Sequence, residues 1–177
     1  MDFERVLGIV SGFFERDGAP FAVIGAFGLH AYGRTRATQD IDFVTEARVQ
    51  PKLIAFLENL EYETLYQSQG YSNHLHDDPS MGRVDFVYVE GETGQKLFEG
   101  KGTTLRLGKI SVPVPQAEHL VAMKVQAMKN DPERALQEMA DIGFLLGLPG
   151  IDQTAVRMYF EKAGLVGVYE EIRKKRT

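Results

Sequence analysis

The chain has 177 residues with a formal net charge of −5, 44% hydrophobic residues, 25% charged residues and no cysteine. This composition is typical of a globular domain, and the negative charge disfavours non-specific coating of nucleic acid. The lack of cysteine excludes disulfides, thiolate zinc sites and cysteine nucleophiles. No apolar run approaches the ~20 residues that span a bilayer, and the first residues do not resemble a signal peptide. We therefore expect a cytoplasmic protein with no membrane partner.

The first part of the sequence alternates between helical and extended patterns. Apolar residues at helical spacing predict a helix over 3–14, and turn residues at 17–20 separate it from a short buried strand over 21–24. A helix over 25–32 then begins at a glycine. A second strand covers 40–44, and a helix over 51–60 carries proline in its first turn. This order predicts an α/β (α+β) fold, with a small mixed sheet flanked by helices.

More strands are expected before the pattern becomes helical. Segments 62–66 and 71–75 form a weak strand pair, and 83–89 alternates like a strand with two different faces. Segments 103–107 and 109–114 flank a glycine like a hairpin. From residue 116 onward we expect only helices, including one that reaches about residue 146 and one or two after residue 150. The sequence therefore predicts a core over residues 1–114 and a helical C-terminal part over 115–177 packed on it.

Two aspartates one residue apart, Asp40 and Asp42, are the most informative feature. On a strand their side chains project from the same face, about 6.6 Å apart along the backbone, while Ile41 and Phe43 point into a core. Two like charges side by side need a cation. Asp85 is a third carboxylate on a later strand, and three carboxylates could hold two Mg²⁺ (or Mn²⁺) ions roughly 3.5–4 Å apart.

The glycine-led helix before this pair suits a phosphate. At Gly25 and Ala26 a helix start presents backbone N–H groups and the positive end of a dipole. This helix start and the aspartates together predict transfer of a nucleoside monophosphate from an NTP. Each feature alone has an ordinary interpretation, because an Asp-x-Asp is often a solvated strand edge and a lone glycine often permits close packing. The order of the features supports the prediction.

The segment 21–44, FAVIGAFGLHAYGRTRATQDIDFV, resembles the signature of the polymerase-β-like nucleotidyltransferase superfamily. This signature is an apolar strand, Gly followed by Gly or Ser, a helix and Asp-x-Asp, with a third acid on a later strand. The segment is most similar to the small bacterial AbiEii-like (toxin-type) branch, where Tyr-Gly-x-x-Arg-Ala-Thr-x-Asp-Ile-Asp variants recur. Ala26 departs from the pattern, so a hydroxyl that could bond a phosphate oxygen is missing.

The resemblance implies a metal-dependent nucleotidyltransferase that moves an NMP from an NTP such as ATP to an RNA end, a protein side chain or a small molecule. It also implies a toxin–antitoxin component, with an antitoxin or a second copy of the chain as partner. The catalytic and metal-binding residues would be Asp40, Asp42 and Asp85. The nucleotide-binding residues would be Gly25, Ala26, Arg36, Thr38 and Lys124. The alternative is a catalytically weak or inactive nucleotide-binding or partner-binding module on the same fold, which Ala26 favours.

Lys124 lies in the middle of the apolar stripe of its helix. Either its stem packs while its ammonium reaches water, or it faces the triphosphate, as a lysine of the AbiEii-like branch does. We expect Asp141 to be solvated, because helical spacing places it on the more polar side of its helix. His74 and His76 precede a proline and a glycine, and we expect them in a mobile loop rather than in a metal site.

Overall fold

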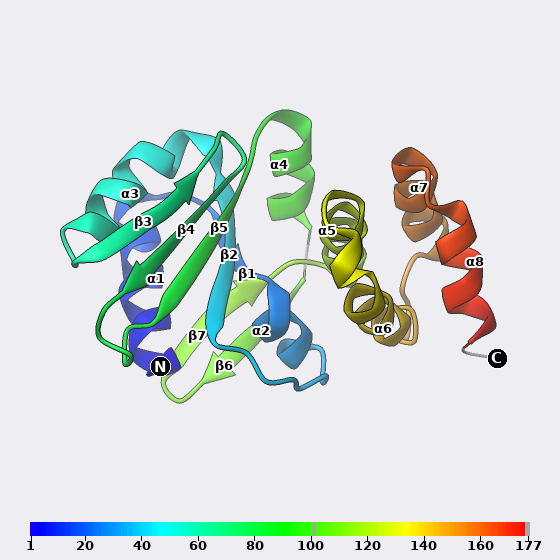
Figure 1. The fold of residues 1–177 in the computed structure, drawn as a ribbon, viewed down its shortest axis with the longest axis horizontal. Helices are drawn as coiled ribbons and strands as arrows, with labels where there is room; N and C mark the ends of the chain where they lie inside the picture. The colour runs from blue at the N-terminus through cyan, green and yellow to red at the C-terminus, as the bar shows by residue number, and fades with distance from the viewer. Residues whose placement is uncertain (101, 176–177) are drawn as a thin grey trace. The chain divides into compact units, whose positions relative to one another are not determined.

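Figure 1 shows the fold of the chain in a computed structural model, which describes residues 1–100 and 102–175. The chain divides into two compact units, Met1–Pro115 and Gln116–Thr177. The first unit contains the sheets, and the described residues of the second form helices and their connections. Across the described parts of the chain, every helix is too short or too polar to cross a membrane.

The first unit is built on a five-stranded sheet with the strand order β1-β2-β5-β4-β3. Strands β2 and β5 run parallel, and the other neighbouring pairs are antiparallel. The strands are β1 (Phe21–Val23), β2 (Asp40–Glu46), β3 (Tyr62–Gln67), β4 (Tyr71–His76) and β5 (Arg83–Val89). This arrangement confirms the predicted small mixed sheet.

Helices and a hairpin complete the first unit. They are α1 (Phe3–Asp17), α2 (Gly25–Ala31), the 3-10 turn η1 (Ala47–Val49), α3 (Gln50–Glu58), α4 (Gly91–Glu99), β6 (Thr103–Leu107) and β7 (Ile110–Val114). Strands β6 and β7 pair antiparallel, as predicted. Helix α4 was not predicted, because Gly91 and Gly94 are poor helix formers. It forms with Gly94 and Leu97 buried, so tertiary packing overrides the weak propensity.

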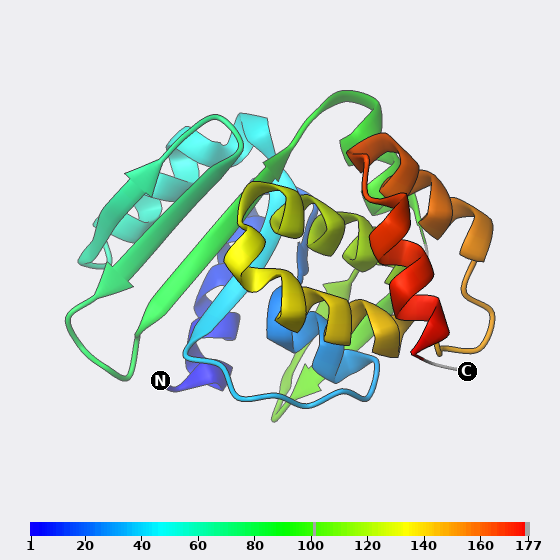
Figure 2. The same cartoon turned by 45° about the vertical axis from the view of Figure 1, so that its right-hand side comes forward.

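One face of the five-stranded sheet carries the hydrophobic core. The rings of Phe43 on β2 and Phe86 on β5 stack with centroids 5.2 Å apart, and Phe14 of α1 packs against both at 6.4 Å. Helices α1 and α3 both lie on this side of the sheet (Figures 1 and 2). Because successive side chains alternate between faces, Asp42 and Asp85 project from the opposite face.

The second unit contains four helices and a 3-10 turn within its described residues. They are α5 (Ala117–Asn130), η2 (Pro132–Arg134), α6 (Ala135–Leu145), α7 (Gln153–Ala163) and α8 (Val166–Lys174). The Asp152 carboxylate caps α7 by accepting from the N–H groups of Thr154 and Ala155 at 2.8 and 3.0 Å. The rings of Phe160 and Tyr169 lie 5.3 Å apart in the core of this unit. The helical pattern expected after residue 116 is confirmed, whereas its packing on the first unit stays a prediction.

The mobile loop expected at His74 and His76 is wrong, because both residues lie within β4. His74 lies within β4 and is 0% exposed. Its Nδ1 lies 3.0 Å from Thr64 Oγ1 and its Nε2 lies 2.8 Å from Ser72 Oγ, which in turn lies 2.7 Å from the Tyr88 hydroxyl. Burial lowers the pKa of His74 to about 4, so the ring is neutral at pH 7. Pairing of β4 with β3 and β5 therefore turns an apparent loop histidine into part of a buried polar network.

This burial predicts acid sensitivity. Between pH 6.5 and about 4 the unfolded chain binds a proton at His74 that the folded chain does not, so the free energy of unfolding falls as the pH is lowered through this window. A difference of 1.36 kcal/mol per pKa unit gives a loss of up to about 3 kcal/mol. Urea unfolding followed by circular dichroism at pH 7.5 and pH 4.5 measures it.

His74→Gln should be less stable at pH 7.5 but should lose this part of the pH dependence. His30→Gln, which removes an exposed imidazole, should keep the wild-type pH dependence. An identical pH dependence in wild type and His74→Gln would contradict the prediction.

Candidate active site

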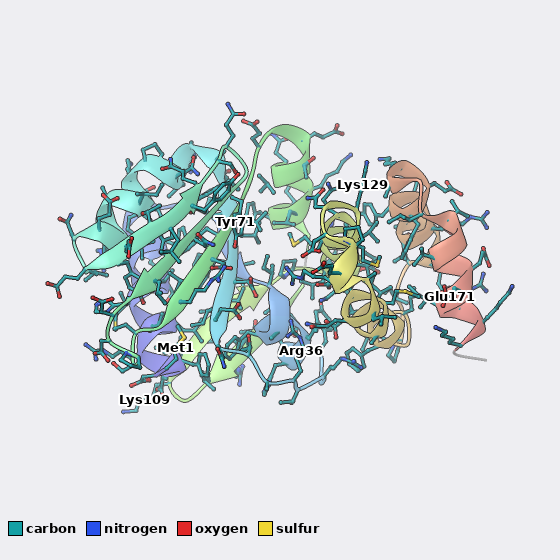
Figure 3. The ribbon with its side chains drawn as sticks, viewed as in Figure 1. Met1, Arg36, Tyr71, Lys109, Lys129 and Glu171 are labelled. Carbon is teal, nitrogen blue, oxygen red and sulfur yellow. The ribbon has the colours of Figure 1, made fainter. Side chains whose placement is uncertain are left out.

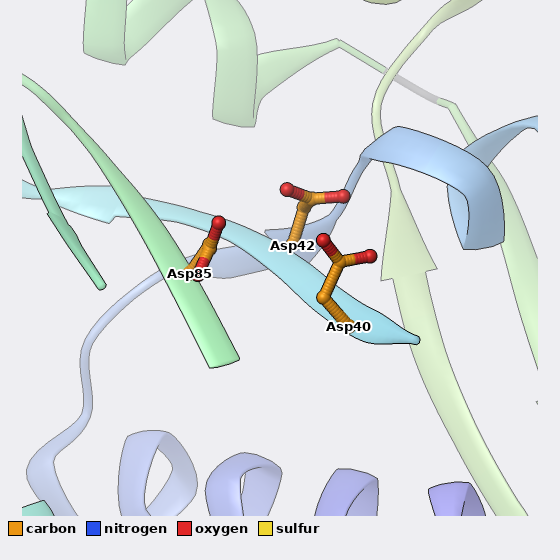
Figure 4. A group of neighbouring side chains, drawn as sticks. All are labelled: Asp40, Asp42 and Asp85. Atoms are coloured by element: carbon orange, nitrogen blue, oxygen red, sulfur yellow. The ribbon is translucent and has the colours of Figure 1, made fainter. Parts of the chain in front are cut away.

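Three aspartates gather on the face of the sheet opposite the core. Asp40 and Asp42 lie on β2 and Asp85 on β5, and the parallel register places Asp42 opposite Asp85. One oxygen from each carboxylate lies within 4.8 Å of the other two, and Asp85 is 6% exposed. Figure 4 shows the three carboxylates projecting from the same side of the two strands. The structure therefore brings together the three predicted ligands, and metal binding stays a prediction.

The segments before β2 position Asp40 and Asp42. The Thr38 hydroxyl hydrogen-bonds to the Asp40 carboxylate, and the Ile24 N–H donates to the Asp42 carbonyl at 2.9 Å. Gly25 has a φ of +59°, and a Cβ on it would lie 1.8 Å from Oδ2 of Asp42. Only glycine satisfies both the left-handed conformation and this close approach. Gly25 was predicted to lie at a phosphate, and its role in making room for the Asp42 carboxylate was not predicted.

Asp85 is held by two side chains that were not predicted to belong to the site. Arg83 donates in a bidentate pair, from Nε to Oδ1 at 2.8 Å and from Nη2 to Oδ2 at 3.0 Å. The Tyr71 hydroxyl donates to Oδ2 at 2.7 Å. Arg83 could have been found from the strand period, because it precedes Asp85 by two residues. Tyr71 could not, because its place depends on the pairing of β4 with β5.

These contacts also determine the protonation states of Tyr71 and Arg83. Burial, together with the hydrogen bond to Asp85, raises the pKa of Tyr71 to about 12, so its hydroxyl remains a donor at physiological pH. Hydrogen bonds to Asp85 raise the pKa of Arg83, which keeps its guanidinium charged. Figure 3 labels Tyr71, which belongs to β4 of the five-stranded sheet. Asp85 therefore has one permanent cation and one neutral donor as neighbours.

The residues predicted to bind nucleotide are distributed over both units. Gly25 and Ala26 begin α2, which has seven residues, and the side chain of Ala26 is buried. Arg36 and Thr38 lie on the connection between α2 and β2, where Figure 3 labels Arg36. Lys124 belongs to α5 in the second unit. Contact of these residues with a nucleotide stays a prediction.

Lys124 belongs to a buried ion-pair cluster in the second unit. It is 7% exposed, and its Nζ donates to Glu138 Oε2 at 2.8 Å and to Asp141 Oδ2 at 2.7 Å. Arg134 lies 3.1 Å from the other oxygen of Glu138. The expectation that Asp141 is solvated is wrong, since Asp141 is 1% exposed and paired with the Lys124 ammonium. The interpretation of Lys124 as a side chain that reaches water is wrong for the same reason.

Comparison with known proteins supports the fold assignment. No protein-family model and no curated protein matches the sequence. The solution structure of the antibiotic-resistance factor ANT(2'')-Ia matches with a TM-score of 0.59 at 16% identity, over 99% of this chain and 94% of that one. Its crystal structure in complex with adenylyl-2''-tobramycin matches with a TM-score of 0.56 at 12% identity, over 98% of each chain. Lincomycin-bound LnuA, a lincosamide antibiotic adenylyltransferase, matches with a TM-score of 0.50 at 14% identity, over 92% of this chain and 97% of that one.

At these identities the likeness shows the fold. The chain therefore has the nucleotidyltransferase fold that the resemblance of segment 21–44 implied.

A pair of glycine variants tests the role of Gly25. Gly25 and Gly18 both have left-handed backbones, with φ of +59° and +67°, but a Cβ on Gly18 would meet no atom within 4 Å. Gly18→Ala should therefore cost only the backbone strain of roughly 1–2 kcal/mol. Gly25→Ala should cost more and should weaken Mn²⁺ binding, because the Asp42 carboxylate must move. Thermal unfolding and calorimetric Mn²⁺ titration measure the two effects, and equal losses in both variants would rule out the proposed role.

A second set of variants tests the Lys124 cluster. Lys124→Met leaves two carboxylates buried without their ammonium, so we expect a loss of about 3–5 kcal/mol in the free energy of unfolding. The triple variant Lys124→Met, Glu138→Gln, Asp141→Asn removes these charges together and should be more stable than Lys124→Met alone. Urea unfolding at pH 7 measures both. A single variant as stable as wild type would show that the ion pairs do not stabilise the unit.

Proposed function

We propose that this chain is a metal-dependent nucleotidyltransferase that moves an NMP from an NTP to a hydroxyl group of an acceptor. The main support is the convergence of Asp40, Asp42 and Asp85 within 4.8 Å on a nucleotidyltransferase fold. Neither observation would suffice alone, because one fold hosts many functions and surface carboxylates often cluster without a ligand. The presence of this carboxylate cluster on one sheet face of a nucleotidyltransferase fold supports an enzyme.

The donor set suits a hard divalent cation. Asp40, Asp42 and Asp85 offer only oxygen ligands, which Mg²⁺ and Mn²⁺ prefer, and their mutual repulsion favours a cation between them. We propose that these residues hold Mg²⁺ (or Mn²⁺). When bound, the ions would offset the negative charge of the carboxylates and polarise the phosphate that reacts.

The proposed reaction exchanges a phosphoanhydride bond of the NTP for a phosphate ester bond to the acceptor. The oxygen of the acceptor hydroxyl bonds to the α-phosphorus, the bond from this phosphorus to the α,β-bridging oxygen breaks, and pyrophosphate leaves with the electron pair. The hydroxyl proton is released.

The protein contributes mainly by positioning the carboxylates. Thr38 and Gly25 place Asp40 and Asp42, and Arg83 with Tyr71 places Asp85. Both oxygens of Asp85 accept hydrogen bonds, from Arg83 and from Tyr71, and these bonds fix the orientation of the carboxylate.

The comparisons suggest a class of acceptor. ANT(2'')-Ia was solved with adenylylated tobramycin and LnuA with lincomycin. Tobramycin and lincomycin are small molecules. We therefore rank the hydroxyl of a small molecule before an RNA end or a protein side chain. The narrower AbiEii-like assignment, with its toxin role and antitoxin partner, rests on the motif in segment 21–44 alone.

The proposal is tested with NTPs labelled at the α-phosphate. Each NTP is incubated with the protein, Mg²⁺ and a host lysate, and label is sought in small molecules, RNA and protein. Asp42→Asn should reduce transfer roughly 100-fold or more, since loss of outer-shell partners of a metal alone costs about 10–100-fold. Asp77→Asn, which neutralises an exposed aspartate in the same unit, should transfer like wild type.

The outcome separates the enzyme from the alternative. Transfer that survives in Asp42→Asn would remove the aspartates from the site. If wild type binds NTP but labels no acceptor, the chain is a nucleotide-binding or partner-binding module, as the replacement of Gly or Ser by Ala26 would favour.

A further inference from the structure

We infer that Arg83 is an internal counter-cation of the aspartate site, which a divalent cation must displace from Asp85 and which then binds a phosphate oxygen of the nucleotide. This inference rests on the proposed function. It assigns a second role to a residue that, in the structure as it stands, only neutralises a carboxylate.

Arg83 lies inside the aspartate site. In the parallel register of β2 and β5, Arg83 is opposite Asp40 and Asp85 is opposite Asp42. All four side chains belong to the same face of the sheet, because paired residues share a face and residues two apart on a strand do too. The site is therefore a block of three carboxylates and one guanidinium, built into two adjacent strands.

Arg83 occupies the oxygens that a metal would use. Its Nε and Nη2 bond to Oδ1 and Oδ2 of Asp85 at 2.8 and 3.0 Å, and Tyr71 adds a third donor to Oδ2. A carboxylate that accepts a bidentate guanidinium has both oxygens engaged in its own plane. Together with Tyr71, Arg83 uses three of the roughly four lone-pair positions of the Asp85 carboxylate, so a cation that binds Asp85 competes with Arg83.

The charges of these four groups also indicate that Arg83 opposes the binding of a metal ion. Three carboxylates and one guanidinium carry a formal charge of −2, so a first divalent cation meets less negative charge than the three aspartates alone would offer. A second divalent cation would make the block positive unless the nucleotide brings its own negative charge. Arg83 therefore ties full metal occupancy to the arrival of the nucleotide.

The displaced guanidinium has access to a ligand. The side chain of Arg83 is 40% exposed, whereas that of Asp85 is 8% exposed, so the guanidinium can move while the carboxylate stays. The planar fork of Arg fits phosphate oxygens as well as carboxylate oxygens. Its backbone remains beside Asp40, which keeps the freed guanidinium next to the site.

The test measures metal affinity without nucleotide and nucleotide affinity with metal. Calorimetric titration with Mn²⁺ alone should give a Kd about tenfold lower for Arg83→Met than for wild type. At saturating Mn²⁺, the Kd of a non-hydrolysable α,β-methylene analogue of ATP should rise about tenfold in the same variant. These changes have opposite signs, and general damage to the site would weaken both. A Mn²⁺ affinity that is unchanged or weaker in Arg83→Met would overturn the inference.

Two further variants separate the guanidinium fork from other effects. Tyr71→Phe removes a neutral donor from the same oxygen of Asp85 and should change the Kd for Mn²⁺ by less than about threefold. Arg83→Lys keeps the charge but loses the fork, and its Kd for Mn²⁺ should lie between those of wild type and Arg83→Met. A lysine variant identical to wild type would show that charge alone acts, and would overturn the competition for Asp85.

Asp42→Asn distinguishes failure of this inference from failure of the proposed function. If Asp42→Asn binds Mn²⁺ as wild type does, the metal site itself is misassigned. If Asp42→Asn loses Mn²⁺ binding while Arg83→Met binds like wild type, only the role of Arg83 is wrong.

Discussion

The parallel pairing of β2 with β5 is the constraint on which the candidate site depends. One register places Phe43 beside Phe86 on the core face and Asp42 beside Asp85 on the opposite face. A shift by one residue would exchange the faces, burying carboxylates among phenyl rings. The aromatic packing that stabilises the sheet is therefore also what holds the carboxylates within 4.8 Å of one another.

Crowded carboxylates oppose folding, and the two units offset this in different ways. In the second unit Lys124 is enclosed with Glu138 and Asp141, so the charges neutralise one another inside the fold. In the first unit Arg83 binds Asp85 but remains partly exposed, and room for the Asp42 carboxylate depends on the missing side chain of Gly25. Removing one member of the enclosed cluster would leave a buried charge without its partner, whereas the exposed guanidinium of Arg83 can move to a ligand.

The sequence alone determined much of the fold and the identity of the three clustered aspartates. Period-2 alternation in 40–44 and 83–89 identified two strands with a polar and an apolar face, and these became β2 and β5. Local periodicity cannot show which strands are neighbours. The sequence placed Asp85 on a later strand, and only the sheet register shows that this strand is next to β2 and brings Asp85 beside Asp42.

What tertiary structure decided is the environment of each charge. The sequence suggested a loop at His74 and a solvated Asp141, and it did not show that Gly25 makes room for a carboxylate. The fold instead buries His74 between two strands, pairs Asp141 with Lys124, and places the Asp42 carboxylate where a side chain on Gly25 would lie. Burial and partners depend on residues distant in the chain, such as Lys124 for Asp141. Sequence patterns therefore determined which residues carry charge and which face of a strand they occupy, and tertiary contacts determined what each charge meets.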